Sequence, residues 1–248
     1  MFPILHIGPL AVQMPGLFLL VGIWVGLTLA GKRAVAYGFK SDSLDNLAIT
    51  ALVAFILGGR IIFVLTNLAI FRNKPLDIFS LNLDLFHPTG GVLAGLLAGF
   101  AYGRSKALPL WPMLDALTPF FATMMVALGL SHFASGAAFG RETSMPWGID
   151  WNGAVRHPSQ VYESAAALFI LGLVLGRKTT APEGVVFLEF TAWSAGARLF
   201  LEAFRGDSTL VFGSLRLDQV IAWIVLASAL LVLEMRRNSK PVEVSEHG

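Results

Sequence analysis

Two arginines of this chain, Arg60 and Arg198, lie inside long apolar stretches. A charged side chain is expensive in such a place, so it is a functional candidate by default. Arg198, Glu202 and Arg205 follow one another at intervals of four and three residues, which puts all three near one face of a helix. A guanidinium there can hold a phosphate by paired hydrogen bonds while the carboxylate orients it. The alternative is an ion pair between Arg198 and Glu202 that only fixes helix packing.

Two further features could serve the same phosphate. Arg60 follows a pair of glycines and could supply a second cation, or its side chain could extend to the membrane interface instead. Gly90 and Gly91 begin another apolar stretch, where their backbone N–H groups could meet a lipid phosphate. The alternative is close helix packing, which also explains the glycine ladders at Gly91, Gly95 and Gly99 and at Gly172 and Gly176.

The longest polar segment between two apolar stretches is 131–160, and we expect it to fold against the helix ends. It leads into the octapeptide 156–163, RHPSQVYE, whose polar groups run directly into the next apolar stretch. Pro158 fits a helix start, and Glu163 lies in the first turns, where a carboxylate suits the helix dipole. Helix capping is therefore an alternative to a binding role for Glu163. For Trp147, the simpler explanation is an aromatic residue at the membrane interface.

The composition predicts the elements that must position these residues. With 55% hydrophobic and 14% charged residues, and a mean hydropathy of +0.69, the chain is too apolar for a soluble protein. A helix needs roughly 20 apolar residues to cross a membrane. The continuous apolar runs do not alternate as those of a β-barrel do. We therefore predict an all-α, polytopic membrane protein with seven transmembrane helices, in the stretches 15–31, 47–70, 85–102, 108–130, 161–176, 185–204 and 217–235.

The distribution of Lys and Arg predicts the orientation, because cytoplasmic loops are enriched in them. The first, third and fifth loops and the tail hold ten of these residues, and the second, fourth and sixth loops hold six. This places the N-terminus outside and the C-terminus in the cytoplasm, with segment 131–160 as an outer-face head. The tail 236–248 is polar and predicted to be flexible. Without a long linker, we expect residues 1–248 to form a single integral membrane domain.

The same counts exclude several classes of function. The net charge of +2 comes from basic residues scattered at helix ends, which favours anchoring to lipid headgroups over nucleic-acid binding. The chain has no cysteine, which excludes disulfides, thiol catalysis and cysteine-based metal sites. We expect neither a metal nor a cofactor, and any thiol chemistry must use a thiol of the substrate.

The octapeptide 156–163, followed by Ala197–Arg198 and the segment 202–205, EAFR, resembles the prolipoprotein diacylglyceryl transferase family. The pairs Gly90–Gly91 and Gly140–Arg141 occur in the family's order and spacing. The resemblance implies seven transmembrane helices and a periplasm-facing head in the bacterial cytoplasmic (inner) membrane. It implies transfer of the diacylglyceryl group of phosphatidylglycerol to the lipobox cysteine thiol of a secreted prolipoprotein, whose signal peptide would be a partner.

The resemblance also implies roles for individual residues. Forming a thioether by displacing a phosphate needs a base near the thiol and cations on the departing phosphate. Arg198 matches the family's essential arginine, and we assign catalytic roles to Arg198, His132 and Glu202. The expected substrate-binding residues are Arg60, His87, Gly90, Gly91, Gly140, Arg141, Arg156, His157, Gln160, Tyr162, Glu163 and Arg205.

The chain departs from the family at five positions. Pro15 replaces a tyrosine and Thr89 a histidine, while Gly129, His132 and Ala137 replace an arginine, an asparagine and a glutamate. His132 could act as the general base in place of the missing histidine, since a histidine pKa of about 6.5 suits that role. His87, two residues before Thr89, is a second candidate. The alternative for both histidines is a polar residue at headgroup level with no catalytic task.

Three functions remain open from the sequence. One is a divergent transferase of this family. Another is a paralogue that acts on a different lipid or acceptor, and the last is a non-catalytic lipid- or lipoprotein-binding membrane protein. A transporter is less favoured, because ionisable residues gather at the outer mouth; for the exceptions, Asp115 and Glu189, we expect helix-end exposure. A catalytic function predicts that Arg198, His132 and Arg141 converge within a few ångströms on one lipid-sized pocket.

Overall fold

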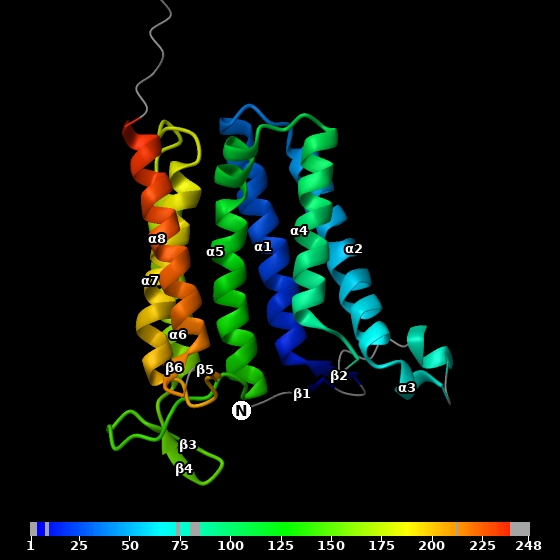
Figure 1. Cartoon of the computed structure of the whole chain (residues 1–248), viewed down its shortest axis with the longest axis vertical. Coiled ribbons are helices and arrows are strands. Elements are labelled where there is room, and N and C mark those ends of the chain that lie inside the picture. The colour runs from blue at the N-terminus through cyan, green and yellow to red at the C-terminus, as the bar shows by residue number, and fades with distance from the viewer. Residues whose placement is uncertain (1–3, 8–9, 73–74, 80–84, 212, 239–248) are drawn as a thin grey trace, which may run out of the picture.

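The computed structural model describes residues 4–7, 10–72, 75–79, 85–211 and 213–238. Helices make up most of it, and the longest run side by side in one bundle (Figure 1). The long helices within this part of the chain are α1 (Met14–Ala36), α2 (Ser41–Thr66), α4 (Pro88–Ser105), α5 (Leu110–Ser135), α6 (Ser159–Gly176), α7 (Val185–Leu201) and α8 (Leu217–Asn238). Each predicted apolar stretch corresponds to one of these helices.

Short elements gather mainly at one end of the bundle (Figure 1). The described strands pair as antiparallel hairpins: β1 (Ile4–Ile7) with β2 (Leu10–Gln13), β3 (Ile149–Trp151) with β4 (Ala154–Arg156), and β5 (Leu210–Val211) with β6 (Leu215–Arg216). Their registers place Ile4 opposite Gln13, Ile149 opposite Arg156 and Leu210 opposite Arg216. The same end holds the short helices α3 (Leu68–Phe71), η1 (Pro75–Phe79) and η2 (Glu202–Phe204).

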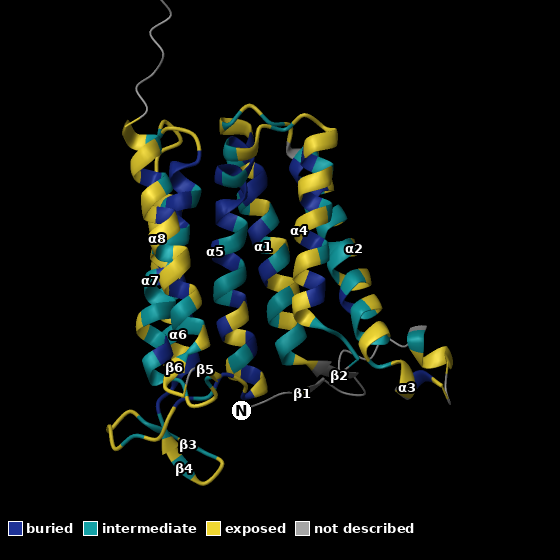
Figure 2. Cartoon of the chain, in the orientation of Figure 1, coloured by how far each residue is buried: buried dark blue, intermediate teal, exposed yellow. Residues whose placement is uncertain are grey.

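Five helices, α1, α2, α5, α6 and α8, are long and apolar enough to cross a membrane. α4 has 18 residues and is rich in glycine, and α7 has 17 residues. Large apolar side chains cover the outside of the bundle: Trp24 is 73% exposed, Leu97 69% and Leu231 68%. Exposing so large an apolar surface to water is unfavourable, so the chain is an integral membrane protein. Figure 2 shows exposed segments, in yellow, along the long helices.

The helices pack through small residues. α1 packs against α5, where a Cβ on Gly22 would lie 2.3 Å from the Cβ of Ala127. α2 packs against α4, where a Cβ on Gly91 would lie 2.8 Å from the carbonyl oxygen of Phe55. Packing is thus confirmed for the α4 ladder. The prediction of close packing is wrong for Gly172 and Gly176, where an added Cβ would meet no atom within 4 Å.

Buried polar contacts tie the helix ends together at the end away from the hairpins. Asp115 of α5 is fully buried, and its carboxylate accepts hydrogen bonds from the N–H groups of Gly184 (2.6 Å) and Phe187 (2.8 Å). The expectation of helix-end exposure is therefore wrong for Asp115, which caps the start of α7. Arg33 of α1 donates to the carbonyl oxygen of Val174 (2.7 Å) at the end of α6.

Segment 131–160 differs in detail from its prediction. Its first residues complete α5, and the hairpin of β3 and β4 projects beyond the helix ends (Figure 1). α8 continues to Asn238, so residues 236–238 are helical and not part of a flexible tail. The rest of the predicted tail, 239–248, lies outside the described residues.

Candidate functional site

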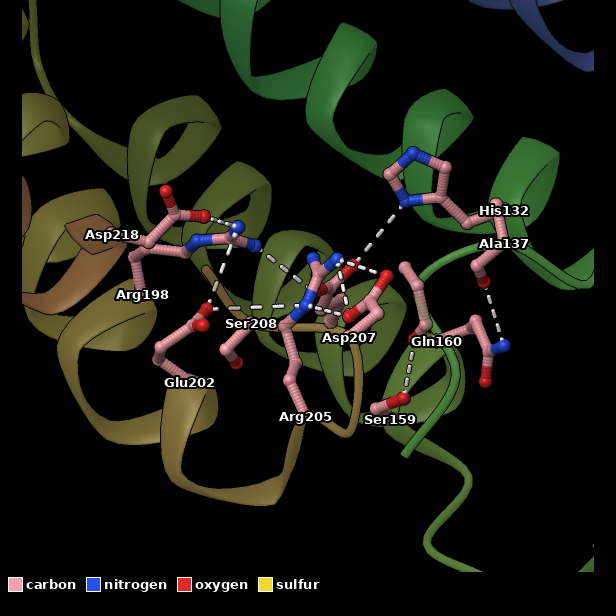
Figure 3. Close-up of polar contacts among 12 residues, drawn as sticks. His132, Ala137, Ser159, Gln160, Arg198, Glu202, Arg205, Asp207, Ser208 and Asp218 are labelled. Atoms are coloured by element: carbon pink, nitrogen blue, oxygen red, sulfur yellow. Dashed lines mark hydrogen bonds and ion pairs between the residues drawn. The ribbon is translucent and has the colours of Figure 1, made fainter. Parts of the chain in front are cut away.

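The carboxylate of Glu163, in the second turn of α6, is the meeting point of three side chains. Its Oε1 accepts hydrogen bonds from Nη1 of Arg198 and from Nη1 of Arg205, both at 3.1 Å. Its Oε2 lies 3.5 Å from Nδ1 of His132. The Glu163 side chain is only 15% exposed. We call these four residues, together with Glu202, Asp207 and Asp218, the Glu163 cluster; most of them are labelled in Figure 3.

The helix-capping alternative for Glu163 is wrong. The first turn of α6 has no side-chain cap, and the N-terminal flanking residue is Pro158. The Glu163 carboxylate instead joins α5, through His132, to the end of α7, through Arg198. Two sequence-predicted catalytic residues are therefore brought to the same carboxylate.

Arg198 contacts three carboxylates. Besides Glu163, its Nη2 donates to Asp218 at the start of α8 and lies 3.5 Å from Oε2 of Glu202. An exclusive packing pair of Arg198 and Glu202 is therefore wrong. Asp218 was not among the residues predicted from the sequence, although an acidic residue at the beginning of an apolar stretch is an available signal. The Arg198 side chain is 34% exposed, so part of the guanidinium remains accessible.

Arg205 lies just beyond α7 and is held from two sides. Its Nε and Nη2 each donate to the carboxylate of Asp207 at 2.9 Å, while Nη1 donates to Glu163. Burial lowers the pKa of the Arg205 guanidinium, but the adjacent Glu163, Asp207 and Glu202 carboxylates raise it by more. Arg205 is therefore a permanent cation in this cluster.

Glu202 is the most buried member of the cluster, with 1% of its side chain exposed. Among the described residues, neither carboxylate oxygen accepts a hydrogen bond, and the nearest cations are Arg198 at 3.5 Å and Arg205 at 3.9 Å. Arg216 donates to the backbone carbonyls of Glu202 and Arg205 (3.0 Å to the latter), which fixes the turn. Glu202 thus acts on Arg198 and Arg205 through its charge.

His132 lies in the last turn of α5 with 27% of its side chain exposed. Because Nδ1 faces the Glu163 carboxylate, the proton is favoured on Nδ1. Among the described residues, Nε2 then has no hydrogen-bond partner, so its lone pair is available to accept a proton. This is the arrangement that a general base requires.

Backbone contacts join the loop before α6 to the turn after α7. Arg141 N–H donates to the carbonyl oxygen of Phe204 (2.9 Å), and His157 N–H donates to that of Arg141 (3.0 Å). A Cβ on Gly140 would lie 2.0 Å from the carbonyl oxygen of His157. Only glycine fits there, because the backbone at His157, in the same loop, lies directly against it.

Arg141 does not converge fully with His132 and Arg198. Its backbone joins the turn that carries Arg205, but within the described chain its exposed guanidinium forms no hydrogen bond or ion pair. His157 is buried, and burial, with a smaller effect of the Arg141 charge, lowers the pKa of its imidazole below the usual 6.5. A lipid-sized pocket at these three residues stays a prediction.

The remaining residues of the octapeptide build the head around the cluster. Arg156 donates to Glu142 (3.2 Å) and lies over the Phe139 ring. Tyr162 OH accepts from Trp147 Nε1 (2.7 Å), so Trp147 belongs to the head's polar network.

Gln160 is almost fully buried beside this network. Its Nε2 donates to the Ala137 carbonyl (2.8 Å), as shown in Figure 3. Its Oε1 is buried and has no hydrogen-bond partner in the part of the chain that the structure describes.

Arg60 and His87 lie elsewhere, on the side of the bundle formed by α2 and α4 (Figure 1). Arg60 donates to the carbonyl oxygens of Ile78 (2.8 Å) and Leu85 (2.6 Å), so it holds a loop. His87 caps α4, because its Nδ1 accepts from Gly90 N–H at 3.1 Å.

The N–H groups of the paired glycines are already in use. Gly90 donates to the His87 side chain, and Gly91 N–H donates to the carbonyl oxygen of His87 (3.0 Å). Phosphate binding by these two N–H groups is therefore not supported by the geometry. The hydrogen bonds of Arg60 to Ile78 and Leu85, and of His87 to Gly90, hold these side chains on their own side of the bundle.

Comparison with known proteins gives one consistent family. The family model described as prolipoprotein diacylglyceryl transferase matches residues 3–235. A Clostridioides difficile protein named phosphatidylglycerol–prolipoprotein diacylglyceryl transferase is 32% identical over 211 residues, covering 84% of each chain. Proteins of the same name from Oleidesulfovibrio alaskensis and Geobacter sulfurreducens are 31% and 30% identical. These alignments cover 94% and 95% of this chain and 92% and 96% of the relatives.

Proposed function

Because the chain belongs to the prolipoprotein diacylglyceryl transferase family, a family of transferases in lipoprotein biosynthesis, we propose that it transfers the diacylglyceryl group of phosphatidylglycerol to a prolipoprotein. The acceptor is the thiol of the lipobox cysteine near the signal peptide. The names of the relatives supply the donor and the acceptor class. The observation that carries the proposal is the convergence of Arg198, Arg205 and His132 on the Glu163 carboxylate.

The proposed setting is the bacterial cytoplasmic membrane, crossed by all seven long helices. α4 and α7 have 18 and 17 residues. At a rise of about 1.5 Å per residue they are roughly 27 and 25 Å long, slightly short of a hydrocarbon core of about 30 Å. The N-terminus lies outside and the C-terminus in the cytoplasm. The Glu163 cluster and the hairpin of β3 and β4 then face the periplasm or exterior.

The reaction forms a C–S bond and breaks a C–O bond. The client thiol loses its proton to Nε2 of His132, and its sulfur attacks the glyceryl carbon that bears the phosphate ester. The C–O bond to phosphate breaks, and glycerol phosphate leaves with the bonding electrons. Arg198 and Arg205 stabilise the charge on the departing phosphate. The thiol must come from the client, because this chain has no cysteine.

Glu163 organises both halves of this chemistry. Its contact with His132 Nδ1 favours the tautomer that leaves Nε2 free to accept a proton. Its hydrogen bonds to Arg198 and Arg205 hold two guanidinium groups about one oxygen. Glu163 is thus a positioning residue, and Glu202 supports the same two arginines from the buried side.

Mass spectrometry on a lipobox peptide, incubated with the purified protein and phosphatidylglycerol, tests this function. We expect a diacylglyceryl adduct on the peptide cysteine, no adduct on a Cys→Ser peptide, and none with Arg198→Ala. His132→Ala should reduce the initial rate by about 10²-fold or more if His132 is the base. Full activity of His132→Ala would exclude that role. No adduct from a folded, lipid-binding protein would contradict the transferase assignment.

The second candidate is a paralogue acting on another lipid or acceptor, or a non-catalytic lipid- or lipoprotein-binding protein. Gly129 favours it, because the family has an arginine there. A Cβ on Gly129 would lie 2.5 Å from Oγ of Ser164, so α5 and α6 pack too closely for that arginine. A phosphate ligand is therefore missing on this side of the cluster. Replacing phosphatidylglycerol by other phospholipids in the same assay separates this candidate from the first.

A further inference from the structure

A second group of charged side chains lies at the end of α6, α7 and α8 opposite the Glu163 cluster. Glu189 of α7 accepts hydrogen bonds at Oε1 from Nη2 of Arg177, just after α6, and from Nη2 of Arg237 on α8, the latter at 2.6 Å. The glutamate is 18% exposed, whereas the side chains of Arg177 and Arg237 are 45% and 50% exposed. Helix-end exposure is therefore not what accommodates Glu189. Two cations around one carboxylate leave one net positive charge, with much of both guanidinium groups accessible.

An apolar groove of about 480 Å³ extends from these charges between α6, α7 and α8. Its α7 wall is formed by Glu189, Ala192, Trp193 and Gly196, at the spacing of one helix face. From Glu189 to Gly196 the groove follows α7 for roughly 10 Å at about 1.5 Å per residue. A Cβ on Gly196 would meet no atom within 4 Å, so the groove is open there. The side walls are apolar and include Leu173 on α6 and Leu226 and Leu230 on α8.

This groove is separate from the Glu163 cluster. Arg198 follows Glu189 by nine residues, which at about 100° per residue places it on the opposite side of α7. Arg198 hydrogen-bonds Glu163 near the start of α6, whereas the groove reaches Arg177 beyond the end of that helix. A headgroup on Arg177 and Arg237 therefore lies away from the cluster.

We propose that the groove binds an anionic phospholipid, with its phosphate on Arg177 and Arg237 and an acyl chain beside Trp193. The paired N–H groups of an arginine guanidinium can bind two oxygens of a phosphate. Basic groups between helices at a membrane surface attract anionic headgroups. Glu189 holds the two guanidinium groups together and reduces their charge. In the orientation proposed above, this lipid belongs to the cytoplasmic leaflet. It is therefore not the donor that reacts at the Glu163 cluster.

Native mass spectrometry of the full-length protein, delipidated and then titrated with phosphatidylglycerol, tests the proposal. Phosphatidylcholine with the same acyl chains serves as the neutral comparison. Relative to wild type, Arg177→Gln combined with Arg237→Gln should weaken one phosphatidylglycerol-binding event by about tenfold or more and leave phosphatidylcholine unchanged. Arg104→Gln removes an exposed charge at the same end of the bundle, on α4, and should have no effect.

Glu189→Gln gives a test of opposite sign. It removes the carboxylate that reduces the charge of the arginines, so phosphatidylglycerol should bind several-fold more tightly. Loss of folding cannot mimic this result. Unchanged affinity in Glu189→Gln, or phosphatidylglycerol binding by the double arginine variant that equals wild type, would overturn the proposal.

Repeating the titration with Arg198→Ala separates this site from the proposed donor site. The groove event should persist in that variant and still respond to the double arginine substitution. If the groove proposal fails, the peptide-adduct assay is unaffected. If the transferase assignment fails, the charge-dependent event at Arg177 and Arg237 remains measurable.

Discussion

At the residue scale, a single carboxylate determines the geometry of the candidate site. Glu163 hydrogen-bonds Arg198 and Arg205 and favours the His132 tautomer with its proton on Nδ1. The sequence identified these four residues because a family signature and the presence of charges in apolar stretches both drew attention to them. It missed Asp218 and Asp207 as partners. The contact of Arg198 with Asp218 depends on how α7 and α8 pack, whereas Asp207 contacts Arg205 within the turn after α7, where the residue spacing does not show that the side chains meet.

We expect Asp218 to compete with the proposed lipid phosphate for Arg198. The two side chains are partly exposed, at 43% and 34%, and Asp218 accepts from Nη2, the terminal nitrogen that does not bond Glu163. Asp218→Asn should therefore lower KM for phosphatidylglycerol by up to about fivefold, the value of an ion pair of this exposure, with kcat unchanged. Initial rates at varied lipid concentration measure this. Asp150→Asn, an exposed carboxylate on β3, is the matched control. An unchanged or raised KM would show that Asp218 only joins α7 to α8.

His157 should make stability depend on pH. Burial and the Arg141 charge lower its folded-state pKa below 6.5, whereas the unfolded chain has the ordinary value. Below about pH 6.5 the unfolded state therefore binds a proton that the folded state resists. His157 stabilises the fold fully above that pH, and the contribution is lost as the pH falls. Thermal unfolding at pH 7.5 and 5.5 should show a smaller decrease for His157→Gln than for wild type. Equal decreases would contradict the assigned shift.

At the element scale, helix positions follow from apolar length, but helix contacts do not. All seven apolar stretches correspond to long helices, because a membrane requires backbone hydrogen bonds to be satisfied within each segment. Glycine spacing alone could not tell the packed ladder of α4 from the open positions Gly172 and Gly176. The short hairpins were not predicted either, since strands of two to four residues carry little pattern. Which face of a helix meets another depends on the whole bundle.

Asp115 illustrates a stabilising contact between elements. It is buried and accepts two backbone N–H groups at the start of α7, Gly184 and Phe187. Asp115→Ala leaves both N–H groups without this acceptor, which should cost about 1–3 kcal/mol. Asp115→Asn keeps one acceptor oxygen and should cost less. Thermal unfolding in one detergent measures the order of stability of wild type and the two Asp115 variants. Asp42→Ala, at the start of α2, is an exposed control. Equal stability of the alanine variant and wild type would show that this cap contributes nothing.

At the scale of the whole molecule, the two ends of the bundle differ chemically. One end combines the head with the Glu163 cluster, where four carboxylates surround Arg198 and Arg205. The other end combines the buried cap at Asp115 with the exposed arginines of the groove. The basic residues that predicted the orientation are concentrated at this second end. If that orientation is right, the chain presents reactive chemistry to one leaflet and lipid-anchoring charge to the other.

The absence of cysteine makes the orientation directly testable. A single cysteine at Met145, which is 47% exposed in the head, should react with a membrane-impermeant maleimide on intact cells. A cysteine at Lys106, exposed after α4 at the opposite end of the bundle, should react only after permeabilisation. The unmodified chain has no thiol and gives the background. We expect this pattern because the loops on the side of Lys106 have an excess of Lys and Arg, and loops rich in these residues stay in the cytoplasm. Labelling of the Lys106 position alone on intact cells would show that the topology is the opposite of the proposed one. The Glu163 cluster would then face the cytoplasm, where it could not reach a client thiol after secretion.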